Sequence, residues 1–167
     1  SETVSAAFSE HIRNGNSVTV ISAVVDDPHG YGRIVRDKRG LSAIVEQRDA
    51  TAAELALKEI NSGAYFFLKS DLLSALKKLR NNNSQNEYYL TDAVRIITSE
   101  GKRAGAFISD NPDCVLGAND RKQLCALSGK ARIAVIEKHM AAGVEFITCE
   151  NVFISPDVEI GADTKIG

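Results

Sequence analysis

Two polar loops stand out among the residues that could do chemistry. The first, residues 26–32, reads Asp-Asp-Pro-His-Gly-Tyr-Gly and follows an apolar, β-branched segment that predicts a buried strand. Open α/β sheets bind their ligands at the carboxyl ends of such strands, so this loop is a candidate ligand site. The second, residues 81–92, begins with six polar side chains that hydrogen-bond to nearby backbone and compete with regular structure. It predicts a shaped loop at the end of one helix, followed by the start of another.

Several other kinds of chemistry have no support in the sequence. Gly30-Tyr-Gly32 is too short to cradle a triphosphate, and no Gly-rich loop followed by a basic residue occurs. The histidines are isolated, so they suggest neither a metal cluster nor a catalytic triad. The three cysteines are odd in number and have no metal-ligand spacing, which favours reduced packing thiols and a cytoplasmic location.

The composition is that of an ordinary globular protein. The 167 residues are 44% hydrophobic and 25% charged, which is enough for a sizeable single core. A formal net charge of −2 offers no electrostatic attraction for nucleic acid or for an anionic membrane, so neither is an expected partner. No apolar run approaches the length that spans a bilayer.

Alternating helix and strand signals position the two loops and predict an α/β fold. Thr51-Ala-Ala-Glu54 matches a capping box, and apolar residues as far as Ile60 extend the helix that it starts. Thr91 is the expected N-cap of the helix after the second loop, and Asn119 that of a long helix ending near Gly143. The other expected elements are helices over about 4–14 and 70–79, strands over 17–25, 63–68 and 103–109, and a hairpin over 33–37 and 41–46.

Five short motifs connect this pattern to a known family. They are Gly30-Tyr-Gly-Arg-Ile34, Ile44-Val-Glu-Gln-Arg-Asp-Ala-Thr51, Glu59-Ile-Asn-Ser-Gly63, the loop Asn81–Asp92 and Gly117-Ala-Asn-Asp-Arg121. In order and spacing they resemble the bifunctional bacterial N-acetylglucosamine-1-phosphate uridyltransferase / glucosamine-1-phosphate acetyltransferase family. The departures are mild: Asn86 replaces a usual glycine, Arg48 a lysine and Ala118 a valine. Asn tolerates the left-handed conformation of glycine, so the loop can keep its shape.

The resemblance implies a nucleotidyltransferase built on a Rossmann-like nucleotide-diphospho-sugar transferase sheet. In this family the first domain joins N-acetylglucosamine-1-phosphate to the α-phosphorus of UTP and forms UDP-N-acetylglucosamine and pyrophosphate. Such a transfer needs in-line positioning and cations, so magnesium is the expected cofactor. The nucleotide-binding loop, its lysine and a metal-binding aspartate precede the region of the family that this chain matches. The chain would then hold the second half of the sheet and the sugar side of the site.

Four site residues follow from the resemblance, and none of them is assigned a catalytic role. Gly32 would offer its backbone to the sugar, since a residue without Cβ lets a ligand approach closely. Glu46 would accept hydrogen bonds from sugar hydroxyls. Asn61 would use both the donor and the acceptor of its side-chain amide on the sugar or its N-acetyl group. Asn119 would bind substrate and magnesium through its amide oxygen, although magnesium usually needs a carboxylate partner as well.

Each of these residues also has a plain structural interpretation. Gly32 is a turn glycine, Glu46 a solvated carboxylate at a strand end, Asn61 the last residue of a helix, and Asn119 an N-cap. Thr91 resembles a family position near the sugar pocket as well, but capping explains it adequately.

The period of the sequence changes after residue 143. Isoleucines at 154, 160 and 166 recur every six residues, and branched residues at 152, 158 and 164 follow the same interval. This hexapeptide pattern predicts the first coil of a left-handed parallel β-helix. The expected domains are a partial uridyltransferase over 1–121, a linker helix over 122–143, and the start of the acetyltransferase domain over 144–167.

Both ends look cut, so we expect a piece of a longer protein that turns over negligibly alone. The parent is expected to form a homotrimer through its β-helix. Two alternatives stay open: a nucleotidyltransferase acting on glucose-1-phosphate, and a non-catalytic oligomerisation module.

Overall fold

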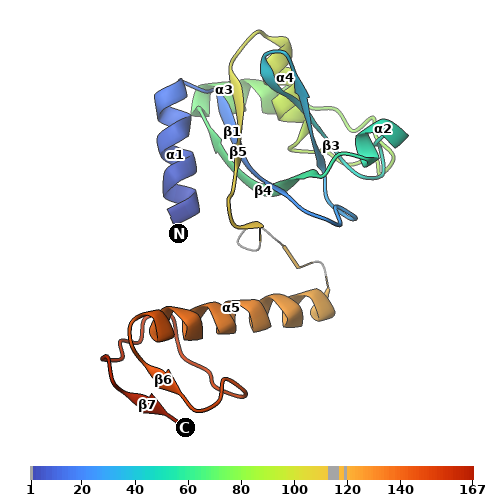
Figure 1. The fold of residues 1–167 in the computed structure, drawn as a ribbon. Coiled ribbons are helices and arrows are strands. Elements are labelled where there is room, and N and C mark those ends of the chain that lie inside the picture. The colour runs from blue at the N-terminus through green and yellow to red at the C-terminus, as the bar shows by residue number, and fades with distance from the viewer. Residues whose placement is uncertain (1, 113–116, 119) are drawn as a thin grey trace. The chain divides into compact units, whose positions relative to one another are not determined.

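The computed structural model describes residues 2–112, 117–118 and 120–167. The chain forms two compact units, Ser1–Val115 and Leu116–Gly167. Figure 1 shows the first as helices around a sheet and the second as one long helix followed by extended chain.

The first unit contains a five-stranded mixed sheet in the order β3-β2-β4-β1-β5. The strands are β1 (Val18–Val24), β2 (Arg33–Asp37), β3 (Gly40–Val45), β4 (Glu59–Phe67) and β5 (Ala104–Ile108). The helices are α1 (Glu2–Asn14), α2 (Ala52–Leu55), α3 (Lys69–Leu76) and α4 (Asp92–Ser99). The predicted α/β class is confirmed.

The strand pairing is unequal across the sheet. β1 pairs with β4 in the antiparallel sense and with β5 in the parallel sense, over most of its length. β2 and β3 form the predicted hairpin, with Arg33 opposite Val45. β2 meets β4 at a single register position, Arg33 opposite Ile60. The hairpin is therefore joined to the rest of the sheet by little backbone pairing.

Burial follows the apolar pattern of the sequence. The first six residues of β1 are buried, as its continuous apolar run predicted. α1 packs against β1 and β5, while α4 packs against β3 and β5 (Figure 1). The main core comprises Val18, Val20, Ile34, Leu41, Ile44, Ala75, Ala93, Val94 and Ile97.

The second helix is shorter than the sequence predicted. The capping box forms, because the Thr51 N–H donates to Glu54 Oε2 at 2.8 Å and the Glu54 N–H donates to Thr51 Oγ1. α2 nevertheless ends at Leu55. Ile60 lies in β4 opposite Ala23 and is fully buried. Its burial against β1 outweighs the local helix signal, so the prediction of a helix through Ile60 is wrong.

One of the two predicted N-caps is confirmed in position, and the other is not. Thr91 stands at the N-cap position of α4, but its backbone is helical and its side chain makes no capping bond. α5 (Arg121–Ala141) is instead capped by Asp120, whose extended backbone lets its side chain accept from the Gln123 N–H at 2.7 Å. Asn119, the predicted cap, lies outside the described residues.

In its described residues, the second unit contains α5 and two short strands. β6 (Glu145–Phe146) and β7 (Lys165–Ile166) pair in parallel at two positions. Two positions do not establish a β-helix, so the predicted coil stays a prediction, as do the domain boundaries near 121 and 143. Within the described ranges, every helix falls short of the length or apolar character that crossing a membrane requires.

Candidate functional site

Gly32 and Glu46 meet at the open end of the hairpin. Gly32 immediately precedes β2 and Glu46 immediately follows β3, so the antiparallel pairing brings them together. A Cβ on Gly32 would lie 3.3 Å from Glu46 Oε2 and 3.3 Å from Ile44 Cγ2. Because Gly32 has no side chain, the Glu46 carboxylate has room beside the Gly32 backbone.

Asn61 reaches the same place from β4. Its N–H donates to the Gly32 carbonyl at 2.9 Å, and its Oδ1 accepts from the Gly63 N–H at 2.9 Å. Its side chain also hydrogen-bonds the Tyr65 hydroxyl. Burial raises the pKa of Tyr65 to about 12; the Asn61 bond opposes this rise, and the negative charge of Glu46 adds to it.

Thr91 also belongs to this candidate site, although the sequence interpretation set it aside in favour of a capping role. Its Oγ1 donates to Glu46 Oε1 at 3.0 Å, and the residue is buried with 5% exposure. Its position within the Asn81–Asp92 motif was the available signal, but capping explained it equally well on the sequence alone. The absence of a capping bond at Thr91 removes that explanation.

The polar loop that leads to Thr91 has a defined shape, as predicted. Asn83 Oδ1 accepts from the backbone N–H groups of Gln85 and Glu87, each at 3.1 Å. Asn86 adopts the left-handed conformation expected of it, with φ of 56°. The Ser84 N–H donates to Asp49 Oδ1 at 2.9 Å, which anchors the loop to the turn after β3.

A buried arginine supports the glycine turn. Arg33 has 2% exposure and donates to the Tyr31 carbonyl and, at 3.3 Å, to Gln47 Oε1. The Gly30 N–H donates to the same Gln47 oxygen at 2.5 Å, and Gly30 has a positive φ of 86°. These bonds fix the chain that presents Gly32.

Residues 1–113 match the nucleotidyl transferase family. The chain belongs to that family. It is 46% identical over 167 residues to the bifunctional protein GlmU of Acetivibrio thermocellus, and 45% identical over 164 residues to that of Clostridium beijerinckii. The bifunctional protein GlmU of Bifidobacterium longum subsp. infantis is 45% identical over 167 residues.

These matches cover 98–99% of the chain but 36% of each relative's own length. They confirm the family that the motifs predicted. The chain thus spans about a third of the length of these bifunctional relatives.

Three of the four predicted site residues lie together in this nucleotidyl transferase unit. Gly32, Glu46 and Asn61 come from three neighbouring strands or their ends, and Thr91 joins them from the start of α4. Asn61 lies within β4, so its interpretation as the end of a helix is wrong. Asn119 lies outside the described residues, and its predicted role stays a prediction.

The described residues do not by themselves form a metal cage. Among residues 2–112, 117–118 and 120–167, no group of three or more His, Cys, Asp or Glu side chains could hold an ion. Glu46, the carboxylate in the site, is already bonded to Thr91. Magnesium usually takes one or two carboxylates together with substrate phosphates, so these residues fit it poorly without further ligands.

A polar cavity of about 290 Å³ lies elsewhere in the same unit. Its lining comes from the hairpin turn, the start of β5 and the chain at the ends of α1 and α4, and includes Arg39, Asn16 and Lys102. None of the four assembled site residues lines it, so the cavity and the candidate site are separate features.

Proposed function

We propose that this chain is the sugar-binding part of an N-acetylglucosamine-1-phosphate uridyltransferase. The longer protein would form UDP-N-acetylglucosamine and pyrophosphate from UTP and N-acetylglucosamine-1-phosphate. The observation that carries the proposal is the convergence of Gly32, Glu46 and Asn61 on one end of the hairpin. Together they offer a charged acceptor, an amide and uncovered backbone, which suit a polar amino-sugar.

The hydrogen bonds around these groups hold them in place before a ligand arrives. Thr91 occupies Glu46 Oε1 and leaves Oε2 on the side of Gly32. Gly63 and Tyr65 hold the Asn61 amide. Ordering side chains in advance lowers the entropy cost of binding, so a rigid acceptor set favours a specific sugar over a general polar surface.

The nucleotide and the metal would be bound largely by other parts of the longer protein. Phosphoryl transfer needs cations near the phosphates, and the described residues supply no metal cage. We assign Asn119 as an amide ligand of magnesium, acting with carboxylates from elsewhere in the protein. The chain of 167 residues alone should therefore turn over negligibly. The parent would also acetylate glucosamine-1-phosphate, form a homotrimer and work in the cytoplasm.

The proposal is tested by titrating the ¹⁵N-labelled chain with N-acetylglucosamine-1-phosphate. We expect the amide signals of Gly32, Asn61 and Thr91 to shift, and glucose-1-phosphate to shift them less. A larger effect of glucose-1-phosphate would favour the glucose-specific alternative. Shifts confined to the polar cavity, or none at millimolar sugar phosphate, would contradict a sugar site here. If this chain alone released pyrophosphate from UTP at the rate of the longer protein, the proposal that other segments bind the nucleotide would be contradicted.

A second candidate function is self-association through the second unit. Its apolar side chains include Ile147, Phe153 and Val158, which are 65%, 81% and 41% exposed. Exposed apolar residues beside an open strand pair favour contact with further copies. Light scattering before and after removal of residues from Val152 onward tests this candidate, because an unchanged mass excludes the segment as the contact.

A further inference from the structure

The hairpin that carries half of the candidate site has few backbone bonds to the strand that carries the other half. Gly32 and Glu46 flank the β2–β3 hairpin, whereas Asn61 lies on β4. The two are joined by the register position of Arg33 and Ile60 and by the bond from the Asn61 N–H to the Gly32 carbonyl. Side-chain contacts between the hairpin and β4 would therefore add to this limited backbone pairing in holding the two halves together.

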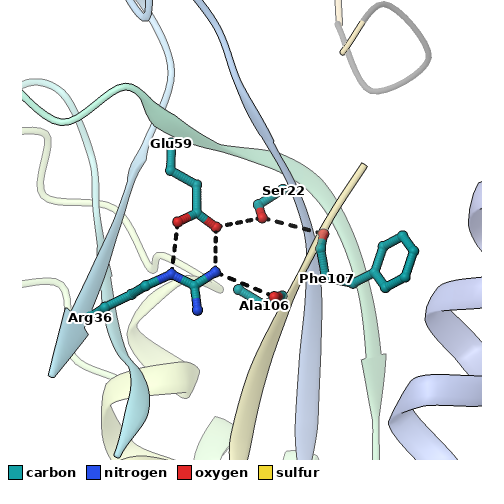
Figure 2. Close-up of polar contacts among 5 residues, drawn as sticks. All are labelled: Ser22, Arg36, Glu59, Ala106 and Phe107. Atoms are coloured by element: carbon teal, nitrogen blue, oxygen red, sulfur yellow. Dashed lines mark hydrogen bonds and ion pairs between the residues drawn. The ribbon is translucent and has the colours of Figure 1, made fainter. Parts of the chain in front are cut away.

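Figure 2 shows a side-chain network at this junction. Arg36 of β2 donates from Nε to Glu59 Oε2 at 2.8 Å and from Nη2 to Glu59 Oε1 at 2.6 Å. This is the bidentate geometry, in which an arginine binds a carboxylate most strongly and with the best-defined orientation. Glu59 is the first residue of β4, so the ion pair joins the hairpin directly to that strand.

The network continues into the two strands beyond β4. Ser22 of β1 is fully buried, and its hydroxyl donates to Glu59 Oε1 at 2.6 Å. The Phe107 carbonyl lies 3.3 Å from the same hydroxyl, whose single proton serves the shorter bond. Arg36 Nη2 also lies 3.3 Å from the Ala106 carbonyl of β5. Four strands thus meet at one ion pair.

The network lies next to the candidate sugar residues. Glu59 and Asn61 are two positions apart on β4 and therefore point to the same face. Ser22 is the register partner of Asn61 on β1. Arg36 lies on β2, which begins directly after Gly32. The ion pair therefore supports, from further along β2, the same contact between strands that the bond from the Asn61 N–H to the Gly32 carbonyl makes.

We infer that Arg36, Glu59 and Ser22 form a clasp that fixes the separation of Gly32 and Asn61. The three are positioning residues, and their effect on a sugar rests on the proposed function. The clasp is better placed for this role than a surface ion pair. The Glu59 side chain is only 14% exposed, so its carboxylate would be left poorly solvated without Arg36.

Hydrogen exchange of the Asn61 amide tests the clasp without any ligand. In Arg36→Met we expect the protection factor of this amide to fall by about tenfold. A fall of this size corresponds to the loss of about one hydrogen bond's net stabilisation. The Ser17 amide, which donates to Arg103 between β1 and β5, should keep its protection. Arg39→Met is the matched control, since Arg39 lies on the same hairpin with a 78% exposed side chain.

Two results would overturn the clasp. One is unchanged protection of Asn61 in Arg36→Met. The other is an equal fall at Asn61 and Ser17, which indicates general destabilisation. Glu59→Gln provides the same test if Arg36→Met does not fold. Arg36→Lys, which keeps the charge but not the bidentate geometry, should restore only part of the protection.

Titration with N-acetylglucosamine-1-phosphate then asks whether the clasp positions the sugar-binding groups. We expect Kd to rise about five- to tenfold in Arg36→Met and Glu59→Gln and to stay unchanged in Arg39→Met. Unchanged affinity in the first two variants would refute the positioning role. If the unsubstituted chain binds no sugar phosphate, the proposed function fails, and the exchange of the Asn61 amide still decides whether the clasp exists.

Discussion

Thr91 and Glu46 are 45 residues apart in sequence and are joined by a hydrogen bond of 3.0 Å. Thr91 lies at the start of α4 and Glu46 just beyond β3, so the bond joins a helix to the end of the hairpin. A glutamate side chain in solution samples many rotamers, and this bond favours those that place Oε1 beside Thr91. The structure thereby converts a flexible carboxylate into a fixed acceptor.

Replacing Thr91 by valine tests the value of that restriction. Valine keeps the shape of threonine and removes the donor. We expect Kd for N-acetylglucosamine-1-phosphate to rise about five- to tenfold, corresponding to about 1 kcal/mol for one hydrogen bond. Isothermal titration calorimetry measures the change. Thr164→Val, at an exposed position of the second unit, is the matched control and should bind like the unsubstituted chain. Equal affinity in the two variants would remove Thr91 from the site.

Replacing Gly32 by alanine tests the close approach of the Gly32 backbone to the Glu46 carboxylate. The added Cβ would lie 3.3 Å from Glu46 Oε2 and from Ile44 Cγ2, a contact that forces one neighbour to move. We expect sugar-phosphate affinity to fall more than about tenfold, while the free energy of unfolding falls by about 1–2 kcal/mol. Calorimetry and urea denaturation measure the two quantities.

The control for this substitution is Gly129→Ala in α5. Among the described residues, no atom beyond the backbone of the helix itself lies within 4 Å of the position that the added methyl would take. Alanine also favours helix over glycine, so we expect a gain of about 0.5–1 kcal/mol in the second unit and no change in affinity. Unaltered sugar binding in Gly32→Ala would mean that the glycine serves only the turn.

Local sequence signals predicted those parts of the fold that depend on neighbours in the chain. The apolar run of β1, the hairpin and the capping box at Thr51 are of this kind. Ile60 and Thr91 were misread because long-range partners decide their conformations. Ile60 packs against β1, and the Thr91 hydroxyl is taken by Glu46. The family motifs gave the candidate sugar-binding residues, yet no local pattern showed that Arg36 and Glu59 connect the strands that carry these candidates.

The buried His11 predicts how stability depends on pH. Burial lowers the pKa of this imidazole below its ordinary value of 6.5, and its Nδ1 lies 2.9 Å from Thr19 Oγ1. The unfolded chain therefore takes up the proton more readily than the folded chain. The stability that His11 contributes is complete above about pH 6.5 and is lost as pH falls through the lower folded pKa.

Urea denaturation of the unsubstituted chain and His11→Gln between pH 5 and 8 measures this contribution. We expect the unsubstituted chain to lose more stability than the variant between pH 7 and 5. From pH 7 to 8 the difference between the two should stay constant, since the imidazole is neutral in both states. Parallel curves over the whole range would show that burial does not disfavour the charged ring.

The titration of Tyr65 tests the closeness of Glu46 and Asn61 without a ligand. Burial is the main cause that raises its pKa to about 12, and the Glu46 charge adds to the rise. In Glu46→Gln we therefore expect the pKa to fall part of the way toward 10, because burial persists when the charge is removed. Absorbance at 295 nm follows formation of the phenolate. Comparison with Tyr65→Phe identifies which of the four tyrosines has the pKa near 12.

The control for this titration is Glu87→Gln, in the exposed part of the polar loop, which should leave the Tyr65 pKa unchanged. Because the neutral phenol is favoured in the fold, the stability that Tyr65 contributes is present below pH 10 and is lost as pH rises toward 12. A Tyr65 pKa that is the same in Glu46→Gln and Glu87→Gln would place the Glu46 charge too far away to influence the phenol. That result would weaken the assignment of Glu46 and Asn61 to one site, because the Asn61 side chain is hydrogen-bonded to that phenol.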